Sequence, residues 1–537
     1  MDPKKGDTVQ NPQSKAPASS GRTLGRRQFL NLTGALVGTA AGAELLAAYG
    51  QSASAAVAAS PTPRTPTGKL TVVTPEKVST LDIQSANSVD RATHTQTRHI
   101  LEALVNRDAV SLSIVPCLAT EWQTPDPLTW VFTLRKGVKF HDGGDFTSAD
   151  VKASLQRTMA QKGPVAPLFA AVDTIETPDA GTVRIRTKTP AGTLLSSLSL
   201  LRIGPADKIG SEGFFRKPIG TGPFVVTYWR PDDSLQLEAN PNYWGPPPGV
   251  KNLVFRTITE IAARVTALET GEIDLTYTLP PDQLPALRKN NELRVVDQRT
   301  FSFFVLWFNC SRKPQSDRRV RQAMWHALDI PTIVRDLFKD VGRPMTAPIP
   351  STVFGYAQQA PYAYDPAKAR QLLAEAGLPN GFEPEVIWNP DSGPQDRELA
   401  QALFSYWNKV GVKVKSRDTE RATWLQNLLA LNFDADLQTN SVTTGDADFN
   451  LRRLYHSTAK RFGYVNTDLD KVLDAAAATV DQQKRKDLYA QANRIIWDDA
   501  VGISLLELST SWVMRQRVSG FTPPIDEMPS FATVQVS

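Results

Sequence analysis

Hydrophobic residues recur along the chain in short runs and alternations that are typical of β-strands. Residues 70–74 form an apolar run bounded by turn residues, which predicts a buried strand. Residues 129–134 have large apolar side chains at every second position, so they predict a strand with one buried face. Residues 181–188 alternate in the same way and place their basic side chains on a solvated face. Residues 301–309 form a continuous aromatic and apolar run of strand length.

Helix signals lie between these strand patterns. Thr147 and Asp150 have the spacing of a capping box, which predicts the start of a helix. Residues 261–268 carry apolar side chains at helical spacing, and Gly271 is expected to close that helix. Helices and strands are thus interleaved along the chain, which favours α/β lobes over a bundle or a sandwich.

Residues 365–377 contain the best delimited helix signal. Asp365 can cap the helix, Pro366 suits its first turn, and Gly377 ends it. Its apolar stripe consists of Ala369, Leu372, Leu373 and Ala376. The chain has 537 residues, more than one hydrophobic core usually supports, so two or three lobes are expected.

The N-terminal region predicts export from the cytoplasm. Arg26 and Arg27 are followed by Phe29 and Leu30, and the stretch of residues 28–43 is uncharged and rich in glycine and alanine. Sites with the small-x-small cleavage pattern follow within residues 53–59. This layout resembles a twin-arginine export signal, which implies that the twin-arginine machinery exports the protein already folded. A transmembrane anchor is the alternative, but polar residues interrupt the apolar run.

The net charge argues against nucleic acid as a partner. The whole chain carries +5, but residues 1–58 hold six basic and three acidic residues, so their removal leaves about +2. Binding to nucleic acid needs a basic patch, which a near-neutral chain does not indicate.

The two cysteines bear on localisation and on cross-linking. Cys117 and Cys310 both lie far from the signal, so a lipid-anchored cysteine is not expected and the mature protein is predicted to be free in the periplasm. Whether the two cysteines pair is open, although their separation favours two buried free thiols.

Catalytic and metal-binding patterns are absent from the sequence. The five histidines form no His-x-x-x-His spacing, and the cysteines form no Cys-x-x-Cys pair. A Gly-x-Ser-x-Gly elbow and a phosphate-binding glycine loop are also missing. The sequence therefore predicts a protein that is not an enzyme and needs no metal or cofactor.

Several motifs carry a resemblance to a known family. Residues 116–122, 129–143 and 146–151 combine a strand, a basic turn, a His-Asp-Gly turn and a capped helix. Together with residues 219–224 and 240–245, this order is similar to the extracellular solute-binding proteins of family 5. That family is the peptide and nickel class of receptors for ABC importers. The resemblance runs from about residue 70 to about residue 521.

The resemblance implies a fold, a domain division and a partner. The implied fold is an α/β periplasmic binding protein of the Venus flytrap type, with two large lobes and a smaller extra lobe that close over the ligand. The implied divisions are a signal and leader over 1–58, a linker over 59–67, lobe I over 68–111, 203–300 and 506–537, lobe II over 112–202, and lobe III over 301–505. It also implies a helix over residues 100–104 and crossovers near 297–309 and 503–510. The expected partner is an ABC permease in the inner membrane, and a monomer is expected.

The stretch of residues 433–451 bears most on the ligand. Oligopeptide binders carry an aromatic residue and, three positions later, an aspartate that pairs with the peptide amine, whereas this chain has Asn440 and Thr443 there. Thr443, Thr444 and Asp446 look instead like the glutathione-binding members. The hydroxyls suit a carboxylate or an amide, and Asp446 suits an amine. Alternatively, Asp446 and Asp448 only fix the turn before the next helix.

Four further residues are candidates for the ligand-binding cleft. Trp307, Asn309 and Trp388 are expected at or near strand ends facing the cleft, where aromatic rings can pack on a peptide plane or a sugar ring. A place in the core is the alternative for each tryptophan. Asn87 lies in a region where family members touch the ligand.

The leading interpretation is a receptor for a short peptide or peptide-like solute, with glutathione the sharpest candidate. A receptor for a sugar-like or opine-like solute is the alternative, because Asn440 removes a stacking surface. An exported hydrolase or a ligand sensor would be an alternative of another class.

Overall fold

The computed structural model describes residues 65–85, 91–161, 163–390 and 395–537. All of them belong to one compact unit, Pro61–Ser537. The predicted export residues Arg26, Arg27, Phe29 and Leu30 lie outside the described residues, as does Asn87.

A long mixed sheet runs through this unit, and a short additional strand, β13 (Gly342–Pro344), pairs with one of its strands, β17. The spatial order is β15 (Lys415–Asp418), β14 (Glu385–Trp388), β16 (Ala435–Ser441), β12 (Leu293–Phe308), β17 (Gly502–Arg515), β11 (Leu275–Tyr277), β1 (Lys69–Thr74), β10 (Asn252–Thr257), β9 (Ser234–Ala239) and β8 (Phe224–Arg230). The apolar runs predicted at 70–74 and 301–309 form β1 and the second half of β12, so both strand predictions are confirmed.

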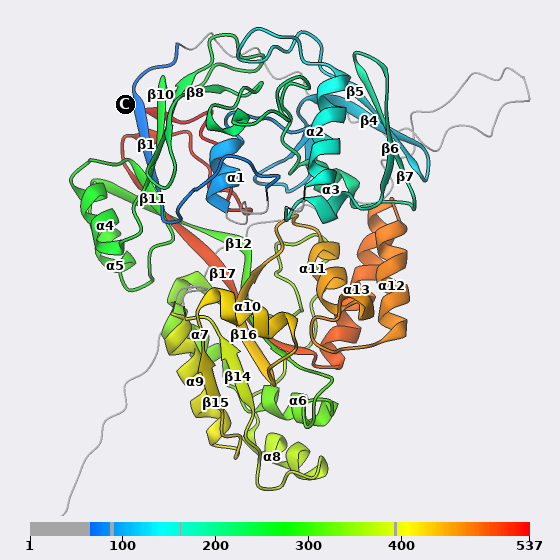
Figure 1. Ribbon diagram of the computed structural model, residues 1–537. Helices are drawn as coiled ribbons and strands as arrows, with labels where there is room; N and C mark the ends of the chain where they lie inside the picture. The colour runs from blue at the N-terminus through cyan, green and yellow to red at the C-terminus, as the bar shows by residue number, and fades with distance from the viewer. Residues whose placement is uncertain (1–64, 86–90, 162, 391–394) are drawn as a thin grey trace, which may run out of the picture. The chain divides into compact units, whose positions relative to one another are not determined.

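Strands β12 and β17 join the two halves of this sheet. They pair with each other in antiparallel fashion over most of their length, with register shifts between Arg299 and Phe303 and between Phe304 and Val305. On the outer edge of β12 lies β16, and on the outer edge of β17 lies β11. Figure 1 shows the two strands running side by side between the two halves. The two segments predicted as crossovers, near 297–309 and 503–510, lie in these two strands and pair with each other.

A second, four-stranded antiparallel sheet packs beneath helix α2 (Ser148–Ala160). Its order is β4 (Ala119–Asp126), β5 (Thr129–Leu134), β7 (Thr182–Thr187) and β6 (Val172–Asp179). The alternation of β5 buries Trp130, Phe132 and Leu134, as predicted. The capping box of α2 is also confirmed, because the Asp150 carboxylate accepts the Thr147 amide proton at 2.7 Å.

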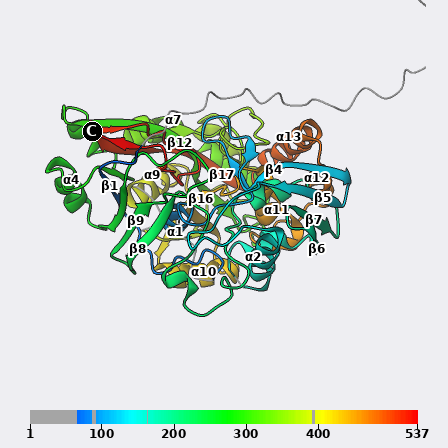
Figure 2. The same cartoon turned by 90° about the horizontal axis from the view of Figure 1, so that it is seen from above.

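The remaining helices cover the sheets (Figures 1 and 2). The part of the chain predicted as lobe III, residues 301–505, holds helices α6 to α13 and is named here the third-lobe region. They are α1 (Arg91–Thr97), α3 (Leu194–Leu198), α4 (Ile261–Glu269), α5 (Leu284–Leu287), α6 (Arg318–His326), α7 (Ile330–Phe338), α8 (Pro366–Glu375), α9 (Asp396–Asn408), α10 (Arg421–Leu429), α11 (Ala447–Tyr455), α12 (Thr467–Ala478) and α13 (Gln482–Asp498). Helix α8 begins after Asp365, whose side chain accepts from the Lys368 amide at 2.8 Å, as the sequence predicts.

Two helix predictions need correction. Residues 100–104 do not form a helix, because the carbonyls of Ala103 and Leu104 accept from the amides of Leu118 and Ala119 in extended backbone. In α4, Ile261 is 38% exposed, so the predicted apolar stripe buries Leu268 but not its first member.

Both cysteines are free. Cys117 is buried in the core of the smaller sheet, and Cys310 is half-buried beside the core of the third-lobe region. Burial raises the pKa of both thiols, that of Cys310 to about 11. Two free thiols are therefore confirmed, although only one of them is fully buried.

Candidate functional site

The loop of residues 441–446, between β16 and α11, is held rigidly against its neighbours. The Val442 amide donates to the Phe301 carbonyl at 3.1 Å, and the Phe354 amide donates to the Gly445 carbonyl at 3.0 Å. Gly445 has φ +63°, and a Cβ at this position would lie 2.6 Å from the Phe301 ring. Only glycine satisfies both the left-handed backbone and the close approach.

Asp446 lies at the end of this loop in a buried ion pair. Its carboxylate accepts from the Asp448 amide at 3.1 Å, which caps α11, and from Arg485 Nη2 at 2.9 Å. Burial would lower the pKa of Arg485, but the Asp446 carboxylate holds it above its ordinary value. Tyr489 Oη accepts a further hydrogen bond from Arg485. The turn-fixing contacts expected for Asp446 are thus present, and its contact with a solute stays a prediction.

The two threonines of the loop differ in their surroundings. Thr444 is buried, and its hydroxyl accepts from the Asp446 amide at 3.3 Å. Its carbonyl accepts a hydrogen bond from Arg107, which is distant in the sequence. Thr443 is half-buried and lines a cavity. Of the predicted loop residues, Thr443 is therefore the one that lines this cavity.

Asn440 precedes this loop in the sequence and lies in β16, opposite Phe303 of β12. Its side-chain oxygen accepts from Asn450 Nδ2 at 3.0 Å, so it braces the strand against α11. Asn440 is half-buried and does not line the cavity described below.

Trp307, Asn309 and Trp388 are packed within the third-lobe region. Trp307 donates to Tyr455 Oη at 2.8 Å and stacks on the Phe462 ring at 4.5 Å. Asn309 is fully buried and donates to two backbone carbonyls. Trp388 is 6% exposed and donates to Ser416 Oγ at 2.9 Å. The structure does not bring these three side chains to the cavity that Thr443 lines.

That cavity, here named the arginine cavity, is a feature that the sequence did not reveal. It is lined by Arg98, Asn106, Arg107, Ser199, Leu200, Arg202, Thr443, Asp526 and Met528. Its residues come from the turn after α1, from the short strand β2 (Val105–Arg107), from the segment after α3 and from the C-terminal segment. Thr443 joins them from the loop before α11. The cavity volume is about 20 Å³, which is room for one or two water molecules.

Arg202 is the most buried of the three arginines, with 3% of its surface exposed. Burial, reinforced by nearby Arg98, lowers the pKa of Arg202 to about 9. Its Nη1 donates to the Ser199 carbonyl at 3.3 Å, while Nε has no hydrogen-bond partner among the described residues. Its guanidinium therefore keeps donor capacity that the described residues do not use.

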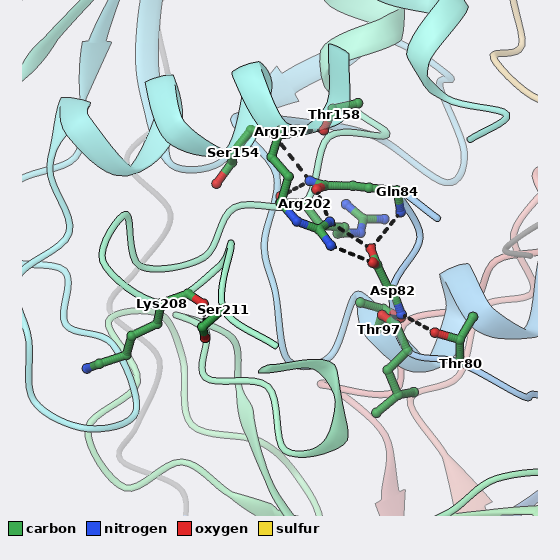
Figure 3. A network of polar contacts seen from close by, with 11 residues as sticks. Thr80, Asp82, Gln84, Thr97, Ser154, Arg157, Thr158, Arg202, Lys208 and Ser211 are labelled. Atoms are coloured by element: carbon green, nitrogen blue, oxygen red, sulfur yellow. Dashed lines mark hydrogen bonds and ion pairs between the residues drawn. The ribbon is translucent and has the colours of Figure 1, made fainter. Parts of the chain in front are cut away.

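The segment that carries Arg202 is fixed by a polar network at the junction of α1 and α2 (Figure 3). Asp82 forms a two-pronged ion pair with Arg157 of α2, at 2.7 and 3.0 Å. Gln84 accepts from Arg157, and its Nε2 donates to the Arg202 carbonyl at 3.4 Å. The network thus ties the backbone of Arg202 to the loop that follows β1.

The C-terminal wall of the arginine cavity is held by Glu527. This buried carboxylate accepts from Ser302 Oγ at 2.8 Å, from Thr510 Oγ1 at 2.5 Å and from Arg91. Because Ser302 lies in β12 and Thr510 in β17, the neighbours Asp526 and Met528 are tied to the ribbon that joins the sheet halves.

Groups for other chemistries are not assembled in the described residues. No cluster of three or more His, Cys, Asp and Glu side chains there has metal-holding geometry. Within the same residues, no helix has the length and apolarity needed to cross a membrane.

Comparison with known proteins identifies the fold and the family. The periplasmic binding protein DppA of Helicobacter pylori, solved in complex with the peptide STSA, superposes with a TM-score of 0.74 at 25% identity, covering 87% of this chain and 98% of that one. The glutathione-binding protein GsiB of Salmonella choleraesuis is 30% identical over 416 residues, which cover 74% of this chain and 81% of GsiB. Heme-binding protein A of Haemophilus influenzae is 29% identical over 468 residues, covering 79% of this chain and 84% of that protein.

The fold is therefore that of a periplasmic binding protein, which confirms the predicted α/β class. Residues 113–462 match the model of the bacterial extracellular solute-binding proteins, family 5 Middle. The chain belongs to the bacterial extracellular solute-binding proteins of family 5. Membership confirms the predicted periplasmic location, a small-molecule or peptide ligand, and an ABC permease as the partner. The family consists of substrate-binding proteins of ABC importers.

Proposed function

We propose that this protein captures a short peptide or peptide-like solute, with glutathione the sharpest candidate, and delivers it to its permease. The observation that carries the proposal is the position of Thr443. This loop residue faces a polar cavity whose other walls come from the predicted first and second lobes. The same class of solute is supported by the relatives, since GsiB is a glutathione-binding protein and DppA was solved with a bound peptide.

Binding in this position is coupled to contact between the lobes. Arg107 donates to Leu112 and Ser196 on its own side and to the Thr444 carbonyl on the other side. A solute that contacts both sides adds interactions that exist only when the sides meet, and so favours the closed state. We propose that the predicted lobes are the parts that move and that the β12–β17 ribbon is the hinge between them.

A thermal-shift screen tests the proposal. The protein is unfolded and refolded to remove any bound solute, then melted with glutathione, with di- to pentapeptides, and with oligosaccharides and amino-acid conjugates as the contrasting set. A solute at a hundred times its Kd adds about 2.7 kcal/mol, which raises Tm by a few degrees. Stabilisation by glutathione or peptides supports the proposal. Stabilisation by the contrasting set alone would replace it with a sugar-like or opine-like solute.

Two properties complete the proposal. The protein acts without turnover, so a bound peptide recovered from it after long incubation is expected to be intact, and cleaved peptide would indicate a hydrolase. It works as a monomer, which light scattering of the purified protein tests directly.

Export is proposed to follow the twin-arginine route. Replacing Arg26 and Arg27 by lysine is expected to strand the precursor in the cytoplasm. Lys4→Arg/Lys5→Arg, a conservative change outside the motif, serves as the control. Normal export of the Arg26→Lys/Arg27→Lys protein would refute this route.

A further inference from the structure

We propose that the arginine cavity is a subsite for a carboxylate group of the bound solute, held by Arg98, Arg107 and Arg202. This inference rests on the proposed function, because it assigns a chemical group to the solute of that receptor. It also narrows the solutes to those with an accessible carboxylate.

The charges around the arginine cavity are unbalanced. Three guanidinium groups line it, and Asp526 is the one carboxylate in the lining. Among the described residues, none of the three arginines has a carboxylate oxygen within 4.0 Å. Asp526 partly offsets Arg107 and Arg202 electrostatically, but among the described residues the lining keeps an excess of positive charge and no ion pair to these arginines.

Neighbouring titratable groups do not correct this imbalance. Glu102 accepts hydrogen bonds from Thr221, Tyr243 and Trp244, and it lies outside the lining. Asp446, which faces Arg107 from the third-lobe side, is paired with Arg485. His94, beside Arg98 and Arg202, is neutral because burial lowers its pKa to about 3.

One buried donor of the lining has no acceptor among the described residues. Arg202 is only 3% exposed, yet its Nε donates to no described residue. A buried donor without an acceptor costs free energy, and a buried cation without a partner costs more. A carboxylate from the solute supplies both the acceptor and the opposite charge, and its planar shape matches the guanidinium fork.

The size and the walls of the arginine cavity define what enters it. About 20 Å³ admits one small charged group of a solute and not a whole peptide. Thr443 lines the same cavity, and its hydroxyl can donate to the second oxygen of the same carboxylate. A carboxylate held in this way contacts both sides of the cleft, so it contributes directly to closure.

The first arm of the test uses a probe that does not depend on the identity of the solute. The purified protein is melted in sodium acetate, in sodium chloride, and in sodium chloride with acetamide added at the same concentration, so that all three have equal ionic strength. Acetate is expected to raise Tm by about 1–2 °C above both controls. Arg202→Gln should abolish this difference, whereas Arg184→Gln, a half-exposed arginine of β7 paired with Glu176, should retain it. If Arg202→Gln does not fold, Arg98→Gln takes its place.

The second arm compares glutathione with glutathione amidated at both carboxylates, by isothermal titration. Amidation is expected to weaken binding about 10- to 100-fold in the wild-type protein, and to matter much less in Arg202→Gln. Equal affinity for the two forms would overturn the subsite and leave the proposed function standing. If neither form binds, glutathione is excluded as the solute and the acetate arm decides the subsite. No acetate effect, or an equal effect in Arg202→Gln, overturns the inference.

Discussion

Breaking the buried pair between Asp446 and Arg485 gives the sharpest test of how the binding loop is held. The two side chains are 4% and 1% exposed, and their charged atoms lie 2.9 Å apart. Asp446→Asn keeps a good helix cap for the Asp448 amide, because asparagine caps helices as well as aspartate does. The substitution therefore removes the charge and little else, and leaves Arg485 buried without its counter-ion.

The expected loss follows from that burial. Removing one partner of a buried ion pair costs about 3–5 kcal/mol, because the other charge is left uncompensated. Arg485→Met should cost a similar amount for the same reason. The double substitution Asp446→Asn/Arg485→Met removes both charges of the pair, so it should cost at least about 2 kcal/mol less than the sum of the two single changes.

Urea unfolding followed by circular dichroism at pH 7 measures all three free energies of unfolding. Asp468→Asn is the matched control, because its pair with Lys471 is almost fully exposed and should matter little. Two single changes that simply add in the double variant would refute the reasoning. Such a result would mean that Asp446 does not neutralise Arg485.

Three further predictions concern the same region. Burial raises the pKa of Asp436 to about 7, against hydrogen bonds from Trp424 and Gln438. Since the folded state then holds this proton more tightly than the unfolded state, stability should fall as pH rises from about 4 to about 7. Asp436→Asn should flatten that part of a Tm-against-pH profile, and an unchanged slope would contradict the assignment. Gly445→Ala should lower Tm more than Gly213→Ala, because both glycines are left-handed but only Gly445 faces a ring, Phe301; equal losses would show that the clash is relieved. Trp307→Phe should cost about 1–3 kcal/mol through the lost bond to Tyr455 and leave the Kd of any solute found in the screen unchanged; a weaker Kd would place Trp307 in the binding site.

Local signals in the sequence were sufficient for many elements. Thr147 and Asp365 mark helix starts correctly because a cap is decided by a few neighbouring residues. Residues 100–104 were misjudged because their backbone pairs with residues 118 and 119, a contact that no local pattern encodes. Ile261 was expected to be buried from spacing alone, but its side chain, in the first position of α4, is 38% exposed.

The candidate site was less accessible to sequence reasoning for a physical reason. The three arginines of the cavity are far apart in the sequence, and no local pattern distinguishes Arg98, Arg107 or Arg202 from an arginine on the surface. Only the fold brings them to one cavity. Trp307 presents the converse problem, since an aromatic residue at that position of a strand suits a core and a cleft equally well.

Strand β17 lies between β11 and β12 in the sheet, although it follows both by a long stretch of chain. During synthesis the ribosome therefore releases β11 and β12 well before the strand that joins them. Until then each half-sheet has an open edge, which is available to other chains. A nascent chain of this protein should accordingly depend on chaperones until β17 has emerged, and truncation before residue 502 should give aggregates rather than a smaller binding protein.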